Sequence, residues 1–148
     1  MVRIVPTLVA ERIESVKAGI GSAGAFAIAE LAIILLGETI VKALSQDNLA
    51  TVILNWESLL QLSFGAISGF LFGVTYRYII RDDRNSHLSD GAVFAFGLIR
   101  GLALIENNLI WSEILSLLFL IAQSIICFAI ARFILDLAIA RSLVKPFI

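Results

Sequence analysis

Cysteine, histidine, proline and charged side chains are all scarce in this sequence of 148 residues. One cysteine excludes an internal disulfide bond, and one histidine beside it excludes an ordinary zinc site. Charged residues make up 16% of the chain, against about 25% in a typical soluble domain. The net charge of -1 gives no basic surface for nucleic acid, so no nucleic-acid partner is expected. The 59% of hydrophobic residues and the mean hydropathy of +0.97 indicate a membrane protein rather than a disordered chain.

Four long apolar runs divide the chain. A helix needs about 20 apolar residues to cross about 30 Å of hydrocarbon. The runs are continuous rather than alternating, and lipid forbids open sheet edges, which argues against strands. We therefore predict an all-α fold, a bundle of four transmembrane helices in a single domain over residues 1–148. The predicted spans are residues 17–37, 56–80, 89–108 and 111–136.

The first fifteen residues contain Pro6 and Thr7 followed by a short amphipathic stretch. Thr7 is a suitable N-cap, and Leu8, Val9 and Ile13 would lie towards one side of a helix. Two interpretations stay open here. The segment is either an interfacial helix that leads into the first span or a frayed terminus.

Positive charges gather on one side of the predicted spans. Nine of the eleven Lys and Arg residues lie at or beyond the span ends on one side, that is, at the start of the first span, between the second and third, and at the end of the fourth. The positive-inside rule then places both termini in the cytoplasm, or in the stroma of a plastid. Aromatic side chains prefer both interfaces, and we expect Trp56 and Trp111 at the outer one and Tyr76 and Tyr78 at the inner one.

The second and fourth spans align at one fixed offset, which suggests an internal repeat. Trp56 then matches Trp111, and Arg77 matches Arg132. We interpret the chain as two helical hairpins in parallel orientation, made of spans one and two and of spans three and four. The alternative is that Trp and Arg occupy these places independently, as interface anchors do.

Small residues recur every fourth position on three spans. Such rows lie on one helix face and let two backbones approach closely. The rows are Gly65, Gly69 and Gly73 on the second span, Gly97 and Gly101 on the third, and Gly21, Ala25 and Ala29 on the first. We expect the row on the second span to pack tightly against another helix. The fourth span has no such row, and we expect it to face lipid or a partner.

Two ionisable residues lie deep inside the predicted spans. Glu30 and Arg100 fall at similar depths, about 20 Å and about 16 Å from the same side at about 1.5 Å per residue. We predict an intramembrane ion pair between them. The pair either fixes helix register or serves a transport path. Among the side chains that could hydrogen-bond across helices is Gln61.

No metal site is predicted. Four glutamates fall near the outer ends of the spans, where a cation site is conceivable, but acids are also favoured in the first turns of helices. Glu-x-x-His pairs are absent from the sequence. The four residues are Glu38, Glu57, Glu106 and Glu113.

The segment between the second and third spans carries charges of both signs. It ends in Ser89-Asp90-Gly91, a plausible helix cap. The segment is either a partner-facing loop or a solvated connector, and both interpretations stay open. Its candidate contact residues are Arg81, Asp82, Asp83, Arg84 and His87.

The stretch YRYIIRDDRNSHLSDGAVFAFGLIRGLA, residues 76–103, resembles small, poorly characterised integral membrane proteins of cyanobacteria and plastids. It covers about a fifth of the chain. The resemblance implies a thylakoid or plasma membrane and no assigned chemistry. It transfers no functional residues.

Nothing in the sequence points to an enzyme, since it has no nucleophile–base arrangement and no phosphate-binding loop. We expect a non-catalytic accessory, assembly or stabilising factor of a larger membrane complex, such as a photosynthetic one. The alternative is a small oligomeric ion or solute transporter or channel that uses Glu30 and Arg100. Expected partners are the lipid bilayer and other membrane subunits or further copies of the chain. The sequence identifies no cofactor.

Overall fold

The computed structural model describes residues 8–42, 56–80, 86–106 and 114–145. Four helices occupy these ranges: α1 (Leu8–Lys42), α3 (Trp56–Ile79), α4 (Ser86–Glu106) and α5 (Ile114–Ala140). Each is long and apolar enough to cross a membrane, and the described ranges contain no strand. The prediction of an all-α bundle of four membrane-spanning helices is confirmed.

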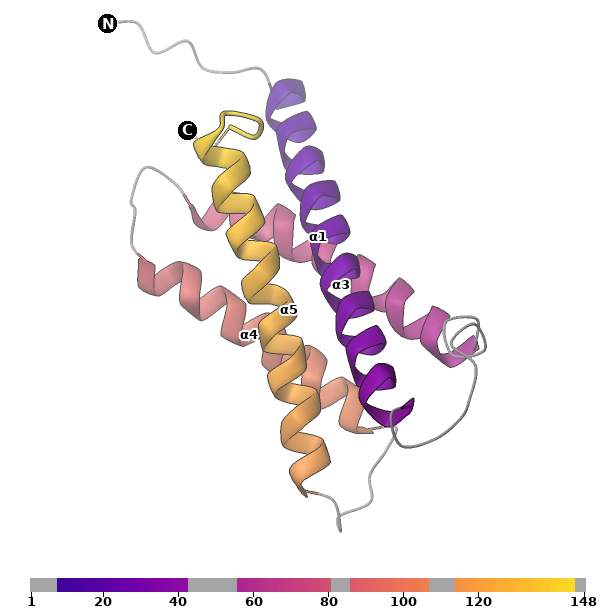
Figure 1. Cartoon of the computed structure of the whole chain (residues 1–148). Coiled ribbons are helices and arrows are strands. Elements are labelled where there is room, and N and C mark those ends of the chain that lie inside the picture. Colours follow the sequence, from indigo (N-terminus) through magenta and orange to yellow (C-terminus); the bar gives the residue numbers. More distant parts are fainter. Residues whose placement is uncertain (1–7, 43–55, 81–85, 107–113, 146–148) are drawn as a thin grey trace, which may run out of the picture.

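The helices pack chiefly in sequential pairs, α1 with α3 and α4 with α5, and α1 also packs against α5. Figure 1 shows α1 and α5 side by side and running in opposite directions, with α3 crossing behind α1 and α4 crossing behind α5. Helix α1 begins and α5 ends at the same end of the bundle, called the terminal end below. The parallel orientation of two repeated hairpins stays a prediction.

Helix α1 is longer than a membrane span requires. Its 35 residues extend over about 52 Å at about 1.5 Å per residue, whereas the hydrocarbon core measures about 30 Å. The amphipathic stretch after Thr7 is therefore the first part of the same continuous helix. The frayed end considered from the sequence is therefore wrong, and the interfacial position of this stretch stays a prediction.

One phenylalanine from each helix meets at the centre of the bundle. The rings of Phe26 and Phe128 lie 4.6 Å apart between centroids, and Phe72 lies 5.1 Å from Phe128 and 5.4 Å from Phe96. Lipid is as apolar as these side chains, so the attraction between the helices comes from close packing rather than from exclusion of water. The four rings join both helix pairs.

The glycine rows of α3 and α4 are each covered by a helix of the same chain. A Cβ atom added at Gly69 would lie 2.8 Å from Cβ of Phe26, and one added at Gly73 would collide with the carbonyl oxygen of Ala18, both on α1. The row on α4 packs in the same way against α5, where Gly97 and Gly101 meet the backbone of Ile125 and Ile121. The close approach expected for the second span is present.

The expectation for the fourth span is wrong on one side of the helix. Phe128 and Ala131 are completely buried and Leu135 is nearly so, because α5 packs against both α1 and α4. Its other side agrees with the expectation, since Phe119 and Phe133 are exposed. A helix that is apolar all round gives no sign of which side is buried, so the sequence could not separate the two.

Two local predictions near the terminal end are also wrong. Helix α4 begins at Ser86, so Ser89 and Asp90 lie within the helix and do not cap it. Tyr76 is buried at 1% exposure rather than placed in an interfacial belt, whereas Tyr78 is 44% exposed. Asp90 and Tyr76 both contact Arg132 of α5 instead, as described below.

Candidate functional site

The structure brings Glu30 of α1 and Arg100 of α4 together in a salt bridge. The Glu30 side chain is 2% exposed and that of Arg100 is 8% exposed. Because the two residues belong to different helix pairs, the ion pair joins the two pairs inside the membrane-spanning part of the bundle.

Gln61 of α3 completes this cluster. Its side-chain Nε2 donates to Oε1 of Glu30 at 3.3 Å, and its backbone carbonyl accepts from Nη2 of Arg100 at 3.2 Å. Cζ of Arg100 also lies 5.1 Å from the centroid of the Phe26 ring, a distance at which a cation is attracted to the ring face. Three helices thus contribute polar groups, which lowers the cost of burying the two charges.

Gly65 provides the space that the ion pair occupies. A Cβ atom at this position would collide with Oε2 of Glu30 and would lie 2.9 Å from Cε1 of Phe26 and 3.0 Å from Nη2 of Arg100. One member of the predicted glycine row is therefore also a wall of the predicted ion pair. The spacing of residues along the chain gives no sign of this connection.

Two buried side-chain oxygens in this part of the bundle have no hydrogen-bond partner among the described residues. They are Oε2 of Glu30 and Oγ of Ser22, which lies two helical turns away on α1. Both hydrogen bonds that Glu30 receives go to Oε1. The carboxylate is thus fully enclosed but engaged through one oxygen.

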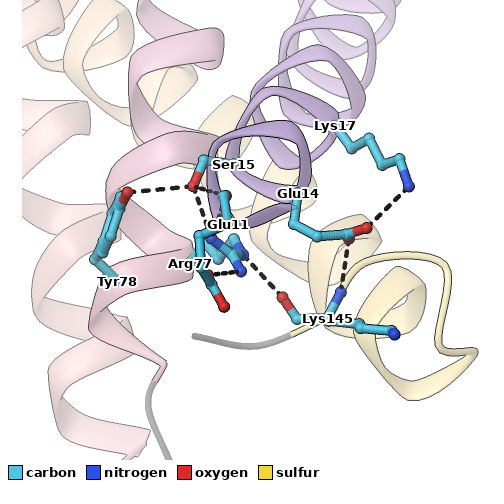
Figure 2. A network of polar contacts seen from close by, with 7 residues as sticks. All are labelled: Glu11, Glu14, Ser15, Lys17, Arg77, Tyr78 and Lys145. Carbon is cyan, nitrogen blue, oxygen red and sulfur yellow. Dashed lines mark hydrogen bonds and ion pairs between the residues drawn. The ribbon is translucent and has the colours of Figure 1, made fainter. Parts of the chain in front are cut away.

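A second polar cluster, centred on Arg77 of α3, lies at the terminal end of the bundle (Figure 2). Arg77 is 1% exposed, and its Nη2 pairs with the carboxylate of Glu11 on α1. Its Nη1 donates to Oγ of Ser15 at 2.7 Å and to the carbonyl of Glu11 at 3.0 Å, and its Nε donates to the carbonyl of Lys145 at 2.8 Å. One guanidinium therefore connects α1, α3 and the segment after α5.

Glu14 makes a further contact between α1 and that segment, also visible in Figure 2. Its carboxylate accepts from the backbone nitrogen of Lys145 at 3.1 Å and from Nζ of Lys17 at 2.9 Å. The segment itself folds back on α5, since Leu143 donates its backbone N–H to the carbonyl of Ala138 at 2.9 Å. The described part of the C-terminal segment is thereby held against the start of α1.

A third cluster, centred on Arg132 of α5, joins α3, α4 and α5. Arg132 pairs with Asp90 of α4, and its Nε donates to the hydroxyl of Tyr76 at 3.2 Å. That hydroxyl donates in turn to Asp136 at 2.7 Å. These contacts explain why Asp90 is not a cap and why Tyr76 is buried.

Arg77 and Arg132 occupy corresponding positions in the predicted repeat. Each lies on the second helix of its pair and binds an acid near the start of the first helix, Glu11 or Asp90. A duplicated hairpin would produce this correspondence, but the repeat stays a prediction. Both arginines resemble interface anchors in the sequence, and the acids that bind them are far away along the chain, so neither cluster was predicted from the sequence.

The other predicted site residues do not assemble into a site that the structure describes. His87 is exposed in the first turn of α4, and Glu57 is exposed in the first turn of α3. Within the described residues, no group of three or more His, Cys, Asp or Glu side chains could hold a metal ion. Arg81, Asp82, Asp83 and Arg84 lie outside the described residues, as do Trp111, Glu113 and the side chains of Glu38 and Glu106.

Comparisons with models of protein families, with curated proteins and with solved structures found no match to this chain.

Proposed function

We propose that this chain is a non-catalytic integral membrane protein that serves as an accessory, assembly or stabilising factor of a larger membrane complex. The observation that carries the proposal is a pair of uncovered glycines on α1. Gly21 and Gly24 have no atom within 4 Å of an added Cβ, in contrast to the glycines that face a neighbouring helix in α3 and α4.

The two glycines lie in one wall of an apolar groove between α1 and α5. The groove has a volume of about 550 Å³ and almost no polar surface. Its floor of small side chains would let the backbone of another helix approach closely, as the covered rows do within the chain. The lining residues are Ile20, Gly21, Gly24, Ala25, Ile28, Ala29, Ala32, Ile130 and Ile134.

We infer that a transmembrane helix of a partner subunit fills this groove. Two of the three predicted rows are covered within the chain. Of the third row, Gly21 lies open, whereas Ala25 is half-buried and Ala29 is buried. The exposed side of α5, with Phe119 and Phe133, would extend the contact surface along the same face as Ile130 and Ile134. The resemblance of residues 76–103 supports a thylakoid or plasma membrane, and the distribution of Lys and Arg supports cytoplasmic or stromal termini.

The test is affinity purification of the tagged chain in mild detergent, followed by mass spectrometry. The proposal predicts a larger complex in fixed stoichiometry. Gly24→Leu should abolish this recovery because it fills the groove, while the isolated chain has room for the added side chain.

Gly37→Leu is the matched control. Gly37 is also exposed on α1 with open space around it, but it does not line the groove. This variant should keep the complex. Recovery of the wild-type chain without any membrane subunit, or equal recovery with both variants, would contradict the proposal.

The second candidate function is a small oligomeric transporter or channel. The observation that favours it is the carboxylate of Glu30, which lies inside the membrane-spanning part and whose Oε2 receives no hydrogen bond from the residues that the structure describes. Acids in such positions are costly and often serve ion pathways. If Glu30→Gln assembles normally but abolishes an ion or solute flux measured in liposomes, the transporter hypothesis replaces the accessory one.

A further inference from the structure

We propose that Glu30 is a proton-binding site, and that the proton is taken up on Oε2. This inference concerns the chemistry of the intramembrane cluster and holds for either candidate function. Its failure would leave the proposed role in a larger complex unaffected.

The two oxygens of the Glu30 carboxylate have different surroundings. Oε1 accepts from Nη2 of Arg100 and from Nε2 of Gln61. Oε2 is buried and receives no hydrogen bond from the described residues. Burying a charged oxygen without a partner costs more free energy than burying a neutral hydroxyl, and a proton on that oxygen removes the charge.

The space around Oε2 limits what can bind there. The backbone of Gly65 lies so close that a single added carbon would collide with Oε2, and Phe26 and Arg100 close the same space. A cation with coordinating waters needs a cavity, whereas a proton adds no appreciable volume. The geometry therefore points to a proton rather than a larger ion.

The charged and titratable groups that face Glu30 come from two elements. Arg100 lies on α4 and Cys127 on α5, while α3 contributes the neutral Gln61. Proton uptake from the aqueous phase would break one O–H bond of a hydronium ion, form one O–H bond on Oε2 and neutralise the carboxylate. No electron is transferred.

Arg100 keeps two contacts when Glu30 is neutral. They are the carbonyl of Gln61 at 3.2 Å and the face of the Phe26 ring. These contacts make the protonated state possible, because the guanidinium is not left without partners. Proton binding would thus remove the attraction between the two charges. The hydrogen bond from Arg100 to the Gln61 carbonyl and the contact of Arg100 with the Phe26 ring would stay.

The experiment is infrared difference spectroscopy of the full chain in lipid vesicles over a range of pH. A buried protonated carboxyl group gives a C=O stretching band separate from that of a carboxylate. We expect such a band to appear as the pH falls and to be absent in Glu30→Gln. The band should remain in Glu57→Gln, which changes an exposed acid in the first turn of α3.

Glu30→Asp keeps the inference testable if Glu30→Gln does not fold, because an aspartic acid in this place should shift the band without removing it. Circular dichroism at each pH establishes that the helices persist. The proposal is overturned if the folded wild-type chain shows no protonated-carboxyl band, or if its bands are unchanged in both variants at position 30.

Discussion

Gly65 of α3 lies directly against the carboxylate of Glu30 on α1, so a residue without a side chain supports a charged residue inside the bundle. The space that Gly65 leaves is filled by Glu30, Phe26 and Arg100. Helix packing and the ion pair are therefore one feature. A change at Gly65 must disturb the charges as well as the packing.

Gly65→Ala should destabilise the bundle, because the added carbon would force Glu30 out of its place. Overpacking of this kind typically costs about 1–3 kcal/mol. Reversible unfolding in mixed micelles would measure the loss. Gly24→Ala is the control, since open space surrounds Gly24, and its stability should stay near that of the wild type.

Arg77→Gln should release the segment after α5 from the start of α1. The substitution removes the donor to the carbonyl of Lys145 and leaves Glu11 without its cation. Hydrogen–deuterium exchange should rise in residues 141–145 and in the first turns of α1. Arg141→Gln is a suitable control because Arg141 is exposed, and exchange that rises equally in both variants would refute the role given to Arg77.

Glu11→Gln should be tolerated better than Arg77→Gln. The guanidinium of Arg77 would keep three neutral acceptors, namely the carbonyls of Glu11 and Lys145 and the hydroxyl of Ser15. Removing one partner of a buried pair costs about 3–5 kcal/mol when the other charge is left without partners, and less is expected here. Comparing the two variants by unfolding in mixed micelles tests this order, and a larger loss in Glu11→Gln would reverse it.

Both ends of the chain should lie on one side of the membrane. Leu8→Cys and Leu143→Cys, at positions that are 80% and 67% exposed, should react with an impermeant thiol reagent from the same side. Trp56→Cys, 69% exposed at the start of α3, should react from the other side. A Cys127→Ser background removes the native thiol, and labelling of the first two variants from opposite sides would contradict four crossings.

Much of the arrangement could be predicted from the sequence because it depends on local or depth-related signals. Continuous apolar runs define the four helices, and four-residue spacing identifies the glycine rows. Glu30 and Arg100 could be paired because two buried charges of opposite sign at similar depths rarely stay apart. Each signal is contained in the spacing of residues along the chain.

The clusters at the terminal end could not be predicted in the same way. Arg77 and Arg132 are found where positive-inside anchors are expected, and nothing local shows that Arg77 is buried. Two of the acceptors of Arg77 are backbone carbonyls, which every residue possesses. Asp90 illustrates the same limit, since its local cap signal was overridden by the ion pair with Arg132.

We conclude that Glu30 and Arg100 join the two helix pairs within the membrane-spanning part of the bundle. A double-mutant cycle with Glu30→Gln, Arg100→Gln and the combined variant, measured by reversible unfolding in mixed micelles, tests it most directly. We predict that each single change is destabilising and that the combined change costs less than their sum, with a coupling free energy of about 0.5–3 kcal/mol. Effects that simply add would show that the two side chains do not interact, and would contradict the claim.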